Sequence, residues 1–348
     1  MNIYQLVHST SLHTGGVAKS THDLSEAFFN LGISFQTSEI TDPEVSGGVI
    51  IAHGLWQWPG VSAYNNWKKK QIPYIIFPHG MLDPWFKKAY PLKHIKKQLY
   101  WWWRQGKILE HAHAVCFTTE EERQLAQKTF WPYRCREIVT GLGVGDPPLD
   151  DRNQVSNFNT KFPQTRGKKF LLYMGRIHPK KGLDLLLKAF ARQKNTNDLL
   201  VIAAPISEDD AFYKTLRKDF KHIEKQVLWT DMLERDLKWG ALRAADCLIL
   251  PSHQENYGMV VAEACSVGTP VLISNKVNLY HEILEYDAGM VEDDTQRGVD
   301  QLVDHWVRGS TQGKSQNARK CFRDKLHISK TAEKIIGLFE EATSSTDS

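Results

Sequence analysis

Residues 247–271 read CLILPSHQENYGMVVAEACSVGTPV, and this stretch carries the pattern that decides the fold. The apolar run CLIL has the length of a buried strand, and PVLIS (270–274) begins a second strand after a short turn. Between them, Gly258 precedes a run whose spacing is typical of a helix. Strand, loop, helix, turn and strand in this order predict one unit of a parallel α/β sheet.

Apolar runs of strand length recur on both sides of this stretch. They are NIYQLVH (2–8), GVIIAH (48–53), IPYIIFPH (72–79), HAVCFTT (113–119), REIVTG (136–141), KFLLYMG (169–175), LLVIAAP (199–205), QVLWT (226–230) and AGMVE (288–292). Continuous apolar runs are expected for parallel strands that are covered on both faces. We therefore predict an α/β fold with two doubly wound Rossmann-like domains that face each other across a cleft.

The domain boundaries follow from composition. Residues 145–167 are polar and rich in Pro, Asp and Asn, so we expect them to link the two domains. The predicted division is an N-terminal domain at 1–150, a C-terminal domain at 151–325 and a last segment at 326–348. We expect that last segment to be helical to about Ala342 and frayed beyond it.

Length and composition exclude several classes of protein. The 348 residues, 41% hydrophobic and 24% charged, exceed one ordinary core and indicate a globular chain of two domains. No apolar run reaches the length of a membrane span, and MNIYQLVHST lacks the pattern of a signal peptide. Five scattered cysteines indicate reduced thiols and a cytoplasmic location: Cys116, Cys135, Cys247, Cys265 and Cys321.

Two cations follow the strand at 169–175. Arg176 and Lys181 lie in the loop before the next helix, at the edge of the sheet where open α/β folds bind ligands. Together they could hold a diphosphate, Arg through its fork of donors and Lys as a point charge. The alternative is an ordinary solvated basic loop.

Two carboxylates flank the predicted helix start at Gly258. Glu255 precedes the helix and Glu263 lies in its second turn, so they do not share one helical face and a shared metal is not expected. The free N–H groups of the helix start suit a phosphate, and carboxylates accept hydrogen bonds from sugar hydroxyls. The alternative is a surface acid beside a helix acid without a ligand.

Together these motifs resemble the retaining nucleotide-sugar glycosyltransferases of glycosyltransferase family 4, which have the GT-B fold. The resemblance covers nearly the whole chain. Its most specific parts are GRIHPKKG (175–182) and residues 251–271, with support from HTGGVAKS (13–20), PHGMLDPW (78–85) and DAGMVED (287–293). The last helix, ISKTAEKIIGLFEEA (328–342), looks like the family segment that crosses back to the first domain.

The resemblance implies roles for individual residues. Arg176 and Lys181 would bind the donor pyrophosphate, Glu255 would hold the transferred sugar, and Glu263 would hold the ribose. His79 would reach the sugar from the first domain. Further donor or phosphate contacts would come from Gly15, Gly16, Asn256, Tyr257, Gly258 and Met259. The donor would be a nucleoside-diphosphate sugar, with UDP or GDP favoured over ADP, and neither a cofactor nor a metal is expected.

Some features depart from the family or leave alternatives open. Asp231 stands where the family usually has Gly, which puts the nucleobase contacts in doubt, and GLGV (141–144) replaces a usual Pro-Asn-Gly-Val at the domain junction.

His79, before Gly80, could instead be a structural histidine bonded to backbone. The same alternatives apply to His53, which also ends a strand.

A basic, aromatic stretch covers residues 85–107, WFKKAYPLKHIKKQLYWWWRQGK. On a regular helix, Leu92, Ile95, Leu99 and Trp102 share one side and are expected in the core, whereas Trp101 and Trp103 lie elsewhere. The stretch could be a solvated helix face, a docking site for an anionic membrane surface, or a nucleic-acid site. No nucleic-acid-binding motif supports the last of these, so no nucleic-acid partner is expected.

The sequence thus predicts a retaining, metal-independent glycosyltransferase that acts on a glycan or lipid-linked acceptor. The pathway suggested by the resemblance is surface or extracellular polysaccharide biosynthesis. The expected location is the cytoplasm, either free or peripheral on the inner face of the membrane. The rival enzymes on the same fold are a sugar phosphorylase and a nucleotide-sugar epimerase. The rival of another class is a sugar-nucleotide-binding protein without catalysis.

Overall fold

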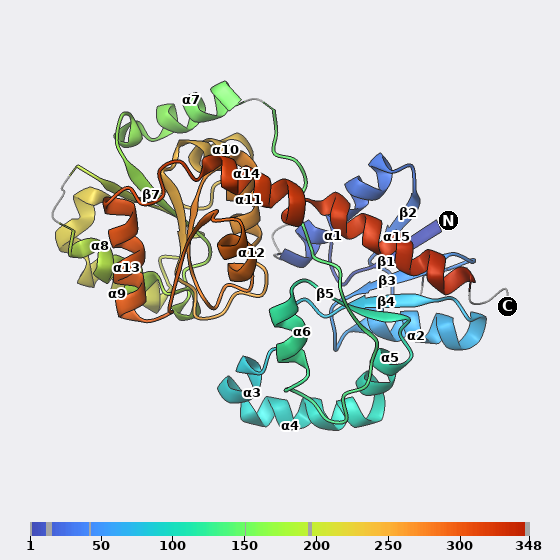
Figure 1. The fold of residues 1–348 in the computed structure, drawn as a ribbon. Coiled ribbons are helices and arrows are strands. Elements are labelled where there is room, and N and C mark those ends of the chain that lie inside the picture. The colour runs from blue at the N-terminus through green and yellow to red at the C-terminus, as the bar shows by residue number, and fades with distance from the viewer. Residues whose placement is uncertain (1, 12–15, 42, 150, 194–196, 345–348) are drawn as a thin grey trace. The chain divides into compact units, whose positions relative to one another are not determined.

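The computed structural model describes residues 2–11, 16–41, 43–149, 151–193 and 197–344. The chain forms two compact units: unit 1 is Met1–Gly145 with Leu326–Ser348, and unit 2 is Asp146–Lys325. Each unit is built around a six-stranded parallel sheet flanked by helices (Figure 1). The predicted α/β architecture with two parallel sheets is confirmed.

The sheet of unit 1 has the strand order β2-β1-β3-β4-β5-β6. Its strands are β1 (Asn2–Leu6), β2 (Ser34–Ser38), β3 (Val49–His53), β4 (Tyr74–Phe77), β5 (Ala114–Phe117) and β6 (Glu137–Val139). Strands β3, β4 and β5 are buried along their whole length, as their continuous apolar sequences require. Strand β2, with the sequence SFQTS, has no apolar run and was not predicted, because it lies at the edge of the sheet and is mostly exposed.

The helices of unit 1 include the last helix of the chain. They are α1 (Gly16–Asn30), α2 (Trp58–Lys70), α3 (Trp85–Ala89), α4 (Pro91–Tyr100), α5 (Gly106–Glu110), α6 (Glu120–Ala126) and α15 (Ile328–Ser344), with a π-helical segment at Trp101–Gln105. Helix α15 packs against α1 (Figure 1), and its Ile335 and Phe339 are fully buried in one cluster with Ile3 and Phe28. The predicted return of the last helix to the first domain is confirmed.

The core predicted along α4 is wrong. Leu92, Ile95 and Leu99 have 77%, 57% and 57% of their surface exposed, and Trp102 has 53%. Trp101 is instead the buried residue, at 1% exposed. Helix α4 buries none of its ten residues, so its apolar side has no core to face. The buried ring of Trp101 lies in the π-helical segment that follows, where the regular helical period used for the prediction ends.

The sheet of unit 2 has the order β12-β11-β10-β7-β8-β9. Its strands are β7 (Phe170–Met174), β8 (Leu199–Ala203), β9 (Val227–Trp229), β10 (Cys247–Leu250), β11 (Val271–Ser274) and β12 (Gly289–Glu292). The helices around it are α8 (Leu183–Ala191), α9 (Ala211–Asp219), α10 (Arg235–Ala244), α11 (Met259–Val267), α12 (Tyr280–Glu285), α13 (Gln296–Val307) and α14 (Ser315–Cys321). All of these strands fall within predicted apolar runs.

The passage at 145–167, expected as a linker, is largely structured. It contains helix α7 (Asp151–Lys161), which packs against α10. Gln154 and Phe158, four residues apart on one face, are almost fully buried, whereas most of the other described side chains of α7 are at least partly exposed. Two buried positions in a polar helix are too weak a pattern to be recognised in the sequence.

Across the described ranges, every helix falls short of the length and apolar character that a membrane crossing requires.

Candidate functional site

The loops after β7 and β10 meet at one edge of the unit 2 sheet. These two strands are parallel neighbours, so their carboxyl ends lie side by side. Gly182 lets the loops touch, because it has a φ of +65° and a Cβ there would lie 2.2 Å from the carbonyl oxygen of Pro251. The backbone N–H of His253 also donates to the carbonyl of Lys180 at 2.8 Å. The sequence motifs around 176 and 255 are thereby joined.

Lys181 and Glu255 form an ion pair across these loops. The ammonium is buried, since the lysine is only 7% exposed, and the carboxylate is partly exposed. The backbone of Glu255 is fixed on both sides: its N–H donates to Lys276 at 2.9 Å, and its carbonyl accepts from Asn278 at 3.1 Å. The two predicted site residues therefore share one location, with the charges held before any ligand arrives.

Arg176 lies in the same loop but has an exposed side chain. Its carbonyl accepts a hydrogen bond of 2.9 Å from the buried Tyr173 hydroxyl, which fixes the backbone at this point. The guanidinium is thus free to turn toward a bound anion, whereas the ammonium of Lys181 is held in place.

Helix α11 begins beside this ion pair. Gly258 is its N-terminal cap, with a φ of +83° that favours glycine, and Met259 is the first helical residue, as predicted. Tyr257 is buried and Asn256 half-buried just before the cap. The free N–H groups and the positive end of the helix dipole lie here, close in sequence to Glu255.

Glu263 has a partner that the sequence analysis missed. It is 3% exposed and accepts a hydrogen bond of 2.6 Å from the ammonium of Lys238 on α10. No sequence pattern indicated this pairing, because Lys238 lies on another helix, 25 residues before Glu263. Glu255 and Glu263 therefore bind two different lysines.

Asp231, the departure from the family pattern, adopts a φ of +61°. This left-handed conformation favours glycine, and aspartate is among the residues that tolerate it. Its Oδ1 accepts from the backbone N–H groups of Ile206 and Met232 at 3.0 and 2.7 Å. The aspartate thus keeps the backbone shape of a glycine turn and joins the loop after β8 to the loop after β9.

In unit 1, His79 ends a chain of hydrogen bonds at the carboxyl edge of the sheet. Its Nε2 lies 3.0 Å from Nδ1 of His53, and Nε2 of His53 lies 3.1 Å from Oε1 of Gln5. The amide of Gln5 is oriented by a 2.8 Å bond from its Nε2 to the hydroxyl of Ser25, which itself donates to the carbonyl of Thr21. His53 and His79 thus belong to one hydrogen-bonded network.

This network determines which ring nitrogens carry hydrogens. Burial lowers the pKa of His79 to about 4, and burial followed by the nearby His79 lowers the pKa of His53 well below its ordinary value. Both rings are therefore neutral at pH 7. Since the oxygen of Gln5 accepts, His53 carries its hydrogen on Nε2 and His79 donates through Nε2. The Nδ1 of His79 is left with a lone pair that accepts hydrogen bonds.

The backbone around His79 is held by a buried acid that the sequence did not single out. His79 has a φ of +50°, which is uncommon for a residue with a side chain. The following N–H, of Gly80, donates to Oε1 of Glu122 at 2.6 Å, and Oε2 of Glu122 accepts from the N–H and hydroxyl of Thr118 at 2.8 and 2.6 Å. Glu122 therefore joins the loop after β4 to the end of β5.

The remaining candidates lie at the start of α1. Gly16 is the first residue of α1, which follows β1, and Gly15 lies outside the described residues. Further along α1, the ligand atoms of His22, Asp23 and Glu26 lie within 4.8 Å of one another. Lys19 already binds both oxygens of Asp23 at 2.8 Å, so an internal cation faces this cluster.

Comparison with known proteins agrees with this geometry. The model described as "Glycosyl transferases group 1" matches residues 156–318, and "Glycosyl transferase 4-like domain" matches residues 46–139. The first match contains Arg176, Lys181, Glu255 and Glu263, and the second contains His79. The chain thus contains two matched glycosyltransferase domains, one of the group 1 type and one of the 4-like type.

Several curated relatives resemble this chain over part of its length. A D-inositol 3-phosphate glycosyltransferase of Mycolicibacterium smegmatis is 33% identical over 170 residues, which are 48% of this chain and 39% of the relative. One from Corynebacterium glutamicum is 30% identical over 199 residues, 54% of this chain and 47% of the relative. The matches span about half the length of these relatives or less.

Solved structures match the whole chain. Sucrose-phosphate synthase of Thermosynechococcus elongatus has a TM-score of 0.77 at 16% identity, covering 99% of both chains. The Anabaena protein HepE, solved with UDP and glucose, has a TM-score of 0.74 at 14% identity, covering 98% of this chain and 100% of HepE. At this identity the likeness shows the GT-B fold, in agreement with the prediction.

Proposed function

We propose that this glycosyltransferase moves a sugar from a nucleoside-diphosphate sugar to a hydroxyl of a glycan or lipid-linked acceptor, with retention of the anomeric configuration. The observation that carries the proposal is the edge of the unit 2 sheet. There Lys181, Glu255 and the start of α11 lie together, and Glu263 is held one turn and a half further along the helix. Cations, free N–H groups and carboxylates are the groups that a diphosphate and sugar hydroxyls require.

The proposed roles follow the chemistry of each group. Lys181 and Arg176 bind the pyrophosphate, together with the N–H groups near Gly258 and Met259. Glu255 accepts hydrogen bonds from hydroxyls of the transferred sugar, and Glu263 accepts them from the ribose. Asn256 and Tyr257 line the donor on the same segment. The complexes of HepE with UDP and UDP-glucose support a uridine donor, with guanosine as the alternative.

His79 and the loop at Gly15 and Gly16 contribute from unit 1. The lone pair on Nδ1 of His79 suits a sugar hydroxyl, which donates a hydrogen bond to it. A neutral imidazole carries no net charge, so its contact with a hydroxyl is a directional hydrogen bond. Gly16, the first residue of α1, has no side chain and so leaves room for the phosphates or for the acceptor, and Gly15 is assigned the same role from its sequence position.

The proposed mechanism needs no protein nucleophile. The bond from the anomeric carbon to the diphosphate oxygen breaks, and the acceptor oxygen bonds to the same face of that carbon. The acceptor proton passes to a phosphate oxygen of the leaving diphosphate. The enzyme lowers the barrier because Lys181, Arg176 and the start of α11 stabilise the negative charge on the leaving group. No metal is assigned a role, since these groups supply the positive charge.

The acceptor, pathway and location are inferred at the level of the family. We place the reaction in surface or extracellular polysaccharide biosynthesis, in the cytoplasm and peripheral on the inner face of a membrane. That arrangement suits a water-soluble nucleotide sugar and an acceptor carried by a lipid.

The test is release of nucleotide from UDP-sugars and GDP-sugars, with and without EDTA and with candidate acceptors. We expect slow donor hydrolysis, transfer on addition of the acceptor, and no loss in EDTA. Arg176→Ala and Lys181→Ala should each lower turnover about 100-fold or more. Near-normal turnover in both variants would contradict the proposal. A requirement for inorganic phosphate would indicate a sugar phosphorylase. Conversion of the nucleotide sugar without an acceptor would indicate an epimerase. Binding of the donor without its hydrolysis would indicate a non-catalytic protein.

A further inference from the structure

Helix α4 exposes an apolar row that the described residues of unit 1 leave uncovered. Not one of its ten residues is buried, and Leu92, Ile95 and Leu99 recur at helical spacing on its outer side. Figure 1 shows α3 and α4 at the margin of unit 1. The row continues into the exposed rings of Trp102 and Trp103, which follow α4. Exposed apolar rows of this size mark a surface that binds something.

The charges around the row are all of one sign. Residues 84–109 contain no acid and seven bases: Lys87, Lys88, Lys93, Lys96, Lys97, Arg104 and Lys107. At ~100° per residue, Lys93 and Lys96 lie on one side of the row, and His94 and Gln98 lie on the other. Burial, and after it the positive charge of the neighbouring Lys93, lowers the pKa of Lys97. The row is therefore a basic amphipathic surface.

An open pocket of about 600 Å³ adjoins the row on the side of His94 and Gln98. Its other wall is the segment at 127–134, which supplies the bases Lys128 and Arg134. Lys87 of α3 completes the basic lining. Among the described residues, neither Lys87 nor Lys128 has a carboxylate within ion-pairing distance, whereas Arg134 makes a long contact of 3.8 Å with Glu110.

The pocket is built from fixed groups. Gln98 donates to the carbonyl of Trp131 at 2.6 Å, and Trp102 donates to the same carbonyl at 2.7 Å. Trp101 donates to the carbonyl of Pro132 at 2.7 Å. The ring of His94 stacks on Phe130 with 4.7 Å between centres. These contacts join α4 to the 127–134 segment, so the row and the pocket form one surface.

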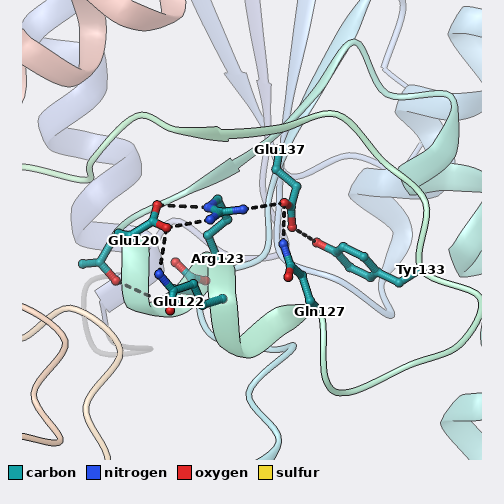
Figure 2. Close-up of polar contacts among 8 residues, drawn as sticks. Glu120, Glu122, Arg123, Gln127, Tyr133 and Glu137 are labelled. Atoms are coloured by element: carbon teal, nitrogen blue, oxygen red, sulfur yellow. Dashed lines mark hydrogen bonds and ion pairs between the residues drawn. The ribbon is translucent and has the colours of Figure 1, made fainter.

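An acid beside this segment, Glu137, is held in place by three donors. Figure 2 shows Glu137 accepting hydrogen bonds from Arg123, Gln127 and Tyr133, at 2.8, 2.8 and 2.9 Å. Gln127 and Tyr133 belong to the pocket wall, so Glu137 positions that wall. Arg123 is shared between Glu137 and Glu120, at 2.8 and 2.6 Å. Among the described residues, the lining of the pocket includes Lys87, Lys128 and Arg134 and contains no acid, so the pocket suits an anion.

We propose that this surface docks on an anionic phospholipid bilayer, with the row of Leu92, Ile95 and Leu99 at the level of the headgroups and a lipid phosphate in the pocket. Both features are needed for this occupant, because a bilayer offers an apolar layer next to a layer of negative charge. A second copy of the chain, packed through the same surface, would place its seven bases opposite these seven bases. A nucleic acid would leave the apolar row uncovered.

The inference rests on the proposed function only for the purpose of docking, which is access to a lipid-linked acceptor. Vesicle binding needs neither donor nor acceptor, and donor hydrolysis needs no vesicle. Failure of the docking surface is therefore distinguishable from failure of the glycosyltransferase reaction.

The first test is co-sedimentation of the full chain with phosphatidylcholine vesicles, with and without phosphatidylglycerol. We expect binding to the anionic vesicles alone, and its loss in roughly 1 M salt, where the screening length is about 3 Å. No binding to anionic vesicles at low salt would overturn the proposal. Binding of inorganic phosphate to the pocket without binding of vesicles would also overturn it.

Two pairs of double variants test whether vesicle binding depends on these particular residues. One pair compares the cations of the pocket with cations elsewhere, and the other compares the apolar row with exposed apolar residues elsewhere. Lys87→Ala with Lys128→Ala should lower the partition coefficient about 25-fold, at about fivefold per cation. The matched control, Lys214→Ala with Lys218→Ala on α9, removes the same charge from exposed positions and should change it far less. Equal losses in the two double variants would contradict a headgroup pocket.

The apolar row has its own matched control. Leu92→Gln with Ile95→Gln should lower partitioning about tenfold or more. Ile40→Gln with Leu284→Gln changes two residues of similar exposure, 70% and 55%, and should leave it unchanged. Unchanged binding in the first variant would overturn the docking surface. So would a dimer, seen by sedimentation velocity, that the first variant abolishes.

Discussion

The carboxyl edges of the two sheets carry opposite kinds of chemistry. In unit 2, two carboxylates each bind a lysine, Glu255 with Lys181 and Glu263 with Lys238. In unit 1, two neutral imidazoles and one amide make a chain of hydrogen bonds without any charge. The difference teaches that the same fold can present an ionic edge, which suits a diphosphate, and a neutral edge, which suits directional contacts to hydroxyls.

Removing the buried cation is expected to have the largest effect. Lys181→Ala should lower turnover by two to three orders of magnitude, about 2.7–4 kcal/mol, because the leaving diphosphate loses a fixed positive charge. Lys188→Ala is the control, since this lysine is half-exposed on α8 and pairs with Asp184 at 3.5 Å. Steady-state kinetics should leave the control within about twofold of the wild type. Similar turnover in both variants would show that the ionic edge is not catalytic.

The close approach of the two unit 2 loops can be broken at one glycine. Gly182→Ala should lower the free energy of unfolding by about 3 kcal/mol, because the new Cβ meets the Pro251 carbonyl at 2.2 Å in a left-handed backbone. Gly167→Ala is matched in φ, +67° against +65°, but has open space around it and should cost about 1 kcal/mol. Urea denaturation measures both. Equal losses would mean that the loops do not depend on this contact.

The neutral edge of unit 1 predicts a pH dependence. The pKa of His79 is lowered to about 4 in the folded state, so the unfolded chain binds more protons than the folded chain between about pH 4 and 6.5. Stability contributed here is present above that window and is lost as the pH falls. From pH 7 to 5 the wild type should lose about 1–2 kcal/mol more than His79→Gln.

Denaturation curves at several pH values check this prediction. Parallel pH profiles for the wild type and His79→Gln would contradict a desolvated neutral imidazole. A steeper loss in the variant than in the wild type would reverse the sign and contradict it more strongly.

The sequence predicted the parts of the structure that depend on local pattern. Long apolar runs gave the buried strands, and a glycine before a helical run gave the start of α11 at Gly258. Adjacent strand ends then made it reasonable to group Lys181 with Glu255. Strand β2 and helix α7 were missed because an edge strand and a mostly polar helix bury too few side chains to leave a pattern.

Pairings between distant elements could not be predicted. Lys238 reaches Glu263 only because α10 packs beside α11, and the bond from Gln5 to His53 depends on the order of strands in the sheet. The burial of Trp101 rather than Trp102 falls in a π-helical segment, which has no reliable sequence signal. These features require three-dimensional coordinates.

The central claim is that unit 2 binds a nucleoside-diphosphate sugar at its ionic edge. The most direct test is a thermal-shift titration with UDP, GDP, ADP and their sugar conjugates. At 100 times the Kd, a ligand of the folded state adds about 2.7 kcal/mol of stability. We predict a clear rise in Tm with a uridine or guanosine donor, lost in Glu263→Ala and kept in the exposed control Glu285→Ala. No rise with any nucleotide, or an equal rise in both variants, would contradict the account.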